Sequence, residues 1–224
     1  MKMPVTFEPL SGDSLDGLDR PEFGLPRGPE MDRLDRHDAI MHQQPAEACS
    51  NGPVIVRRQR ADDYEAIRQV YAAAFRRSEN PEAVPLEVGI FQALWEAGDL
   101  IPELSFTALE EVEAVGHATA SRATVAADSV VAVGPIGVLP EHQGRGIGSA
   151  LMEALLAAAD TADVPMVVLL GSPQYYARFG FRSAQGLGVI PPEPTWGEAF
   201  QARPLTAYTP AVGGRFQYAP AFSS

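Results

Sequence analysis

The chain has 224 residues, of which 46% are hydrophobic and 21% charged, a composition typical of a soluble globular protein. The sequence has no run of eighteen apolar residues that could span a bilayer, so we do not expect the chain to be a membrane protein. The net charge is −12 and Lys2 is the only lysine, which disfavours non-specific binding to nucleic acid because phosphates require a basic face.

The cysteine and histidine content argues against a disulfide or a metal site. Cys49 is the only cysteine, and the four histidines have no spacing typical of metal ligands. The N-terminus lacks the apolar segment of a secretory signal. We therefore expect no metal and a cytoplasmic location.

Residues 1–52 differ in composition from the rest of the chain. They are rich in Pro, Gly, Asp and Arg, carry ten acids against five bases, and have no sustained hydrophobic period. This pattern predicts a disordered acidic tail. The folded domain is then expected over residues 53–224.

The first half of that domain predicts a strand, two helices and a hairpin. A β-rich run at 54–56 precedes a helix capped by Asp62 or Asp63, and a second helix ends near Gly98. Two further β-rich runs flank the acidic residues 110–113, which favours a hairpin. A mostly apolar strand follows at 129–140 and is expected to be central.

The second half predicts an amphipathic helix after residue 146, a buried strand at 164–171, a short helix within 172–181, and two more strands near 181–186 and 198–205. Strands and helices that alternate in this mixed order indicate an α/β domain. We expect a mixed parallel and antiparallel central sheet with helices on both faces.

The stretch PEHQGRGIGSALMEALLAAA, residues 140–159, places three glycines directly before a strongly helical sequence. The first N–H groups of a helix are unpaired and carry partial positive charge, so they bind anions without a basic side chain. Glycines at 144, 146 and 148 allow a phosphate to approach these amides closely. The turn therefore predicts a phosphate-binding site.

Two common phosphate-binding motifs do not fit this turn. A Walker loop requires a lysine, and the only one is Lys2. A dinucleotide fingerprint beginning at Gly144 would need a third glycine where Ser149 stands.

The segment Gln143-Gly144-Arg145-Gly146-Ile147-Gly148 instead resembles the Q/R-x-x-G-x-G/A signature of the GNAT superfamily of N-acetyltransferases. The flanking GPIGVLPEHQGRGIGSALM and LLGSPQYYARFGF resemble that superfamily's two cofactor-binding segments, and VGHATAS at 115–121 adds a third similarity. The resemblance covers about 53–224. It implies a GNAT-like sheet splayed at its two central strands, acetyl-CoA as acyl donor, and a primary amine as acceptor.

Pro135, Gly134 and Gly137 interrupt the expected central strand, since proline removes a ladder hydrogen bond and glycine weakens pairing. If this strand parts from 164–170, its free backbone groups can pair with the amides of pantetheine. We therefore expect the acetyl-CoA site to include the residues Ile136, Val138, Gln143, Gly144, Arg145, Gly146, Ile147, Gly148 and Ser149, with an N–H near Val138 holding the oxyanion.

Tyr176 occupies the position that the resemblance gives to the proton donor, in the pattern Y-x-x-x-G-F, although the adjacent Tyr175 is an alternative. The central strand lacks the glutamate that many relatives use as general base. His117 is the candidate base, with a structural histidine or a water chain as alternatives. Glu110, Glu111 and Glu113 are expected to form a solvated hairpin face.

The sequence leaves two other functions open. A non-catalytic acyl-CoA binding or sensing module would keep the cofactor cleft without a competent base. A protein-interaction module would instead use the acidic residues 1–52. Whether the chain is a monomer or a homodimer is also left open.

Overall fold

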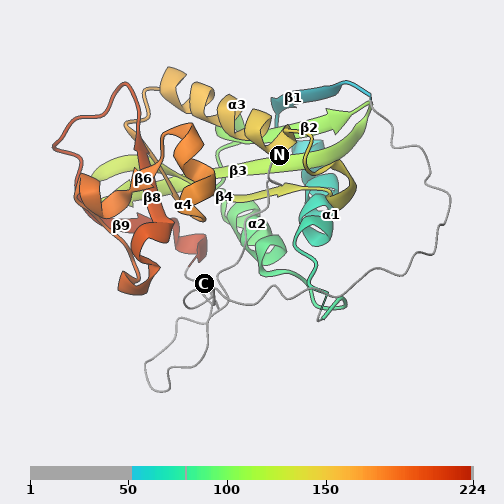
Figure 1. Ribbon diagram of the computed structural model, residues 1–224, viewed down its shortest axis with the longest axis horizontal. Coiled ribbons are helices and arrows are strands. Elements are labelled where there is room, and N and C mark those ends of the chain that lie inside the picture. Colours follow the sequence, from blue (N-terminus) through green and yellow to red (C-terminus); the bar gives the residue numbers. More distant parts are fainter. Residues whose placement is uncertain (1–51, 79, 223–224) are drawn as a thin grey trace.

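The computed structural model describes residues 52–78 and 80–222 (Figure 1). The helices are α1 (Tyr64–Ala74), α2 (Leu86–Ala97), α3 (Ile147–Thr161) and α4 (Pro173–Tyr176). The strands are β1 (Val54–Arg58), β2 (Phe106–Glu110), β3 (Glu113–Val125), β4 (Asp128–Val138), β5 (Met166–Leu170), β6 (Arg182–Ser183), β7 (Val189–Ile190), β8 (Phe200–Pro204) and β9 (Gly214–Tyr218). The expected tail, residues 1–52, lies outside this description except for Gly52.

The strands form an open mixed sheet in the order β1-β2-β3-β4-β5-β8-β6, with β9 pairing to the far half of β3 and to β7. The pairs β4–β5 and β7–β9 are parallel and the others antiparallel. The expected α/β class with a mixed sheet is confirmed.

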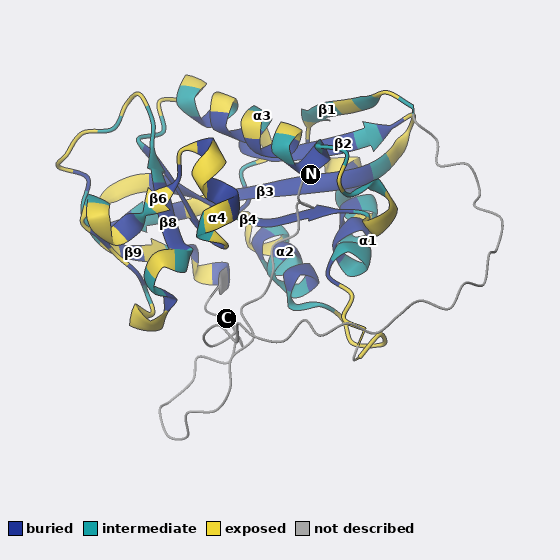
Figure 2. Cartoon of the chain, in the orientation of Figure 1, coloured by how far each residue is buried: buried dark blue, intermediate teal, exposed yellow. Residues whose placement is uncertain are grey.

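Helices cover both faces of the sheet, as expected. The side chains of α3 and α4 pack on one face, where Ala118 and Ala120 of β3 belong to their hydrophobic cluster. The side chains of α1 and α2 form a separate cluster on the opposite face. Because side chains alternate along a strand, His117 and Thr119 point toward α1. Figure 2 shows β3 and β4 buried between these two layers.

The two central strands part where the sequence places its proline and glycines. β4 pairs with β5 only from Val131 to Val133, although β4 continues to Val138. Beyond Val133, β4 pairs only with β3, whose register shifts between Ala118 and Ala120. Beyond Val133, the polar backbone groups of β4 that face away from β3 therefore have no strand partner among the described residues.

Three local expectations need correction. Asp63 is the N-cap residue of α1, one of the two positions expected, but its side chain makes no capping hydrogen bond to α1, because its carboxylate accepts hydrogen bonds from Arg57 and from the Arg60 N–H. The strand expected at 181–186 is only the two-residue β6. β9 was missed, although its alternating sequence GRFQY carries the period of a half-buried strand.

No helix within residues 52–78 and 80–222 combines the length and the apolar character that crossing a membrane requires.

Candidate active site

The glycine turn has the backbone that anion binding requires. Gly144 and Gly146 adopt φ of 75° and 86°, in the left-handed region that only glycine enters readily. Gly146 is the N-cap of α3, and no side chain caps the helix. The first N–H groups of α3, among them those of Gly148 and Ser149, are thus left without a capping side chain.

The larger side chains beside these glycines are directed into the protein. The Gln143 amide donates to the Val138 carbonyl oxygen at 3.0 Å, which ties the turn to the end of β4. Ile147 is 5% exposed and packs against β3, where a Cβ at Gly116 would lie 3.2 Å from its Cγ2. The close approach of α3 therefore leaves little room for a side chain at position 116.

Arg145, one of the residues expected in the acetyl-CoA site, is paired with a carboxylate. Its Nη2 donates to Glu110 Oε1 at 2.6 Å, and His142 Nε2 lies 2.9 Å from Glu110 Oε2. The hydrogen bond from Arg145 lowers the pKa of Glu110. Glu111 and Glu113 are exposed as expected, but Glu110 is only 7% exposed and does not belong to a solvated face.

The two adjacent tyrosines of α4 have different surroundings. Tyr176 is 3% exposed, and its ring packs among Tyr175, Phe179 and Phe181. Gly171 has no room for a Cβ because the Tyr176 ring lies against it. Burial raises the pKa of Tyr176 above its usual value, so its phenol stays protonated.

The Tyr175 hydroxyl is buried without a hydrogen-bond partner among the described residues. Burial raises the pKa of Tyr175, and Ser149 in the first turn of α3 moderates that rise. The ring lies under the Arg178 guanidinium at 4.5 Å, and Arg178 also donates to the Tyr175 carbonyl oxygen. Tyr175 thus lies near Ser149 at the beginning of α3 without a hydrogen bond to it.

His117 lies in a buried polar network on the α1 face. Its Nδ1 is 2.6 Å from the Tyr71 hydroxyl, and its Nε2 is 2.9 Å from Gln59 Oε1. The Tyr71 hydroxyl donates its one hydrogen to the Pro135 carbonyl oxygen at 2.8 Å. Burial lowers the pKa of His117 to about 3, so the ring is neutral near pH 7.

Most of the expected site residues come together. Ile136, Val138, Ile147, Tyr175 and Tyr176 all belong to the hydrophobic cluster on the α3 face of the sheet. Ile136 and Val138 are nearly fully buried, so any contact they make with a ligand would come from their backbone. His117 stands apart on the other face of β3, with both ring nitrogens engaged by protein side chains.

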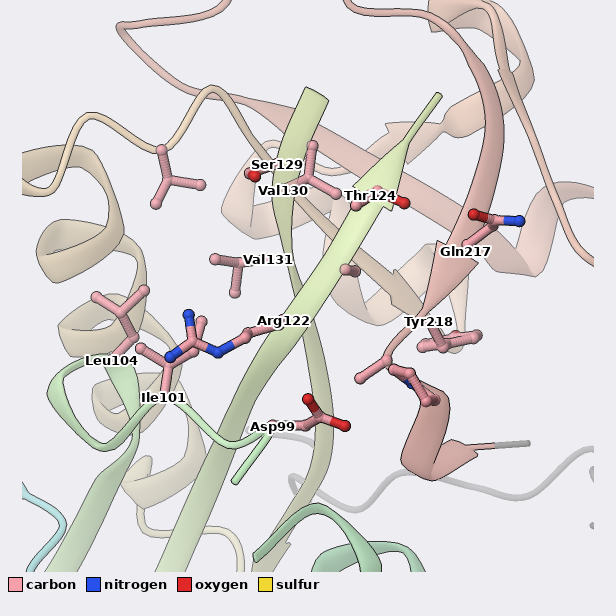
Figure 3. A pocket seen from close by; sticks show the side chains of 14 residues that line it. Asp99, Ile101, Leu104, Arg122, Thr124, Ser129, Val130, Val131, Gln217 and Tyr218 are labelled. Atoms are coloured by element: carbon pink, nitrogen blue, oxygen red, sulfur yellow. The ribbon is translucent and has the colours of Figure 1, made fainter. Parts of the chain in front are cut away.

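A groove of about 540 Å³ lies at the opposite end of α3 (Figure 3). Its lining includes Leu104 and Val164, together with Arg122, Thr124 and Ser129 from β3 and β4. Val164 follows α3, whose 15 residues span about 22 Å. None of the expected site residues lines this groove, so it is separate from the glycine turn.

Comparison with known proteins identifies the family. Residues 64–181 match the model of the acetyltransferase (GNAT) family. The chain is 31% identical over 128 residues to the uncharacterized N-acetyltransferase YjhQ of Escherichia coli (strain K12), covering 55% of this chain and 67% of that protein. The chain therefore belongs to the GNAT acetyltransferase family.

Solved structures agree with this assignment. A GNAT acetyltransferase from Brucella melitensis, in complex with acetyl-CoA, is 31% identical with a TM-score of 0.62, over 77% of this chain and 99% of that one. The Escherichia coli N-acetyltransferase YhbS, in complex with CoA, shares the fold with a TM-score of 0.68 at 23% identity, over 82% of this chain and 97% of that one.

Glu110 and the Tyr71–Pro135 contact were not expected from the sequence. In the sequence Glu110 is one of three acidic residues of a hairpin, and only its three-dimensional contact with Arg145 distinguishes it from the other two. Tyr71 and Pro135 are 64 positions apart in the chain, so no local pattern in the sequence indicates their contact.

Proposed function

We propose that the protein is an N-acetyltransferase that moves the acetyl group of acetyl-CoA to a primary amine. The observation that carries the proposal is the uncapped, glycine-rich beginning of α3 beside the parted end of β4. Family membership and the CoA and acetyl-CoA bound to similar proteins support it.

In this proposal the pyrophosphate of acetyl-CoA binds to backbone N–H groups of residues 144–149. The positive end of the α3 dipole favours its negative charge. Pantetheine then extends along β4, where its amides pair with the backbone groups that β5 leaves without a partner. Gln143 and Ile147 contribute by fixing the turn to β4 and β3.

The transfer itself needs a donor to the oxyanion, an acid for the thiolate and an acceptor for the amine proton. The neutral amine attacks the thioester carbon, a backbone N–H near Val138 stabilises the oxyanion, and the C–S bond breaks as the amide forms. Tyr176 gives its proton to the departing thiolate and regains one from water, and the phenol is protonated before the transfer because burial raises its pKa.

The proton of the amine requires a different acceptor. His117 is a poor candidate, because its nitrogens contact Tyr71 and Gln59 and burial lowers its pKa to about 3. We therefore propose that water carries this proton and that His117 supports β4 through Tyr71.

A turnover assay tests the proposal. Purified protein is incubated with acetyl-CoA and a panel of small amines and peptides, and release of free thiol is measured. Amine-dependent release above the hydrolysis background supports the enzyme. Tight binding of acetyl-CoA without release for any amine would instead favour the acyl-CoA sensing module.

A further inference from the structure

We propose that Glu110 is a positioning residue that holds the glycine turn in the conformation that binds pyrophosphate. This inference rests on the proposed function. Glu110 ends β2, so it is anchored in the sheet, and its two carboxylate oxygens contact residues on either side of Gly144. One carboxylate thus bridges His142 and Arg145 across the turn.

The turn requires such an anchor because of its glycines. Glycine loses more conformational freedom on folding than any other residue, and both Gly144 and Gly146 are fixed here at positive φ. Neither has a side chain that can hold this conformation. The residues between and beside them therefore have to supply the constraint.

Those residues are all tied to the sheet. His142 and Arg145 are bound to Glu110 of β2, and Gln143 is bound to the Val138 carbonyl of β4. Arg145 also reaches the Gly52 carbonyl oxygen at 3.4 Å. With the side chains held in this direction, the backbone N–H groups at the beginning of α3 are left for a ligand.

The ion pair between Arg145 and Glu110 also neutralises the negative charge of Glu110 beside the turn. A bare carboxylate so close to a bound pyrophosphate would repel it, but Arg145 compensates Glu110 at 2.6 Å. Arg145 consequently acts through Glu110 on the shape of the turn, and the backbone amides provide the direct contacts with phosphate.

The test replaces Glu110 and measures acetyl-CoA binding by calorimetry. Glu110→Ala should weaken binding by between about tenfold and a hundredfold, by analogy with groups that orient the ligands of a metal ion. Glu110→Gln keeps one acceptor for Arg145 and should recover part of the affinity. Glu113→Ala is the matched control, because Glu113 is exposed and pairs with Glu110 in the β2–β3 register.

A second donor separates positioning from a general loss of structure. The acetyl thioester of pantetheine lacks the pyrophosphate, so its rate of acetyl transfer at low concentration should be the same in Glu110→Ala and the parent chain. An equal loss of transfer rate with both donors would overturn the proposal. Unchanged acetyl-CoA binding in Glu110→Ala would also overturn it. Tighter binding would do the same, because it would mean that Arg145, once released from Glu110, binds the phosphate directly.

Arg145→Ala provides an independent measurement if Glu110→Ala does not fold. The effects of Arg145→Ala and Glu110→Gln on acetyl-CoA affinity should be non-additive. Glu110→Gln should therefore weaken binding less in the Arg145→Ala variant than in the parent chain. Full additivity would contradict the bridge. Failure of the parent chain and Glu113→Ala to bind acetyl-CoA would refute the proposed function, an outcome distinct from normal binding by every variant.

Discussion

The two faces of the central strands differ in whether their polar groups have hydrogen-bond partners within the protein. On the α3 face, the N–H groups at the beginning of α3 have no capping side chain, and β4 extends beyond its pairing with β5. On the α1 face, His117, Tyr71, Gln59 and Thr119 satisfy one another in a buried network. Uncommitted donors at a turn indicate binding, whereas mutually satisfied groups in a core indicate structural support.

The largest expected effect tests the catalytic role on the α3 face. Tyr176→Phe removes the phenolic proton but keeps the ring that packs among Phe179 and Phe181. Turnover should fall by roughly 10² to 10⁴, the usual scale for a general acid, while acetyl-CoA affinity stays nearly unchanged. Steady-state kinetics with calorimetry measures both quantities.

Tyr175→Phe is the matched control for this prediction. It removes a hydroxyl that is buried without a partner among the described residues. If Tyr175→Phe loses turnover and Tyr176→Phe retains it, the assignment is wrong by one residue. If both variants keep full turnover, water protonates the thiolate.

The next effect tests whether the turn binds through its backbone. Gly146→Val places a β-branched residue at φ of 86° and crowds the amides of α3. Loss of one hydrogen bond to a charged group is worth about 1.5–3 kcal/mol, so acetyl-CoA affinity should fall by roughly tenfold to a hundredfold. Circular dichroism should still show a folded protein, and unchanged affinity in calorimetry would contradict the role of the turn.

The sequence predicts the α3 face better than the α1 face for a physical reason. The glycine turn and its helix are adjacent in the chain, so a local pattern can predict both the helix and the proposed anion site. The His117 network joins residues 46 and 58 positions apart, and no local period records such contacts. The pairing of Glu110 with Arg145 across 35 positions was missed for the same reason.

The α1 face is tested by the dependence of stability on pH. His117 has a folded pKa of about 3, whereas an unfolded histidine titrates near about 6.5. Between these values the unfolded chain binds a proton that the folded chain does not, so stability should fall as pH is lowered, by up to about 1.4 kcal/mol per pH unit. Urea denaturation at several pH values measures this slope.

His117→Gln supplies the comparison. The variant should be less stable at pH 7, but its stability should vary less between pH 6.5 and pH 4 because the titrating group is gone. Asp63 acts in a lower range: burial raises its pKa, but hydrogen bonds from Arg57 and Arg60 lower it overall, so its contribution is lost below its unfolded value. Equal slopes in the two proteins would show that His117 does not titrate with unfolding.

The smallest expected effect concerns residues 1–52. Their sequence offers too few periodic apolar residues to join a hydrophobic core, and β1 begins only at Val54. A shortened chain that starts at Asn51 keeps Gly52, whose carbonyl oxygen contacts Arg145 beside the glycine turn. It should therefore melt within a few degrees of the full chain and bind acetyl-CoA with the same affinity. A large drop in melting temperature would mean that the removed segment packs on the domain, whereas a loss of affinity alone would place it at the cofactor turn.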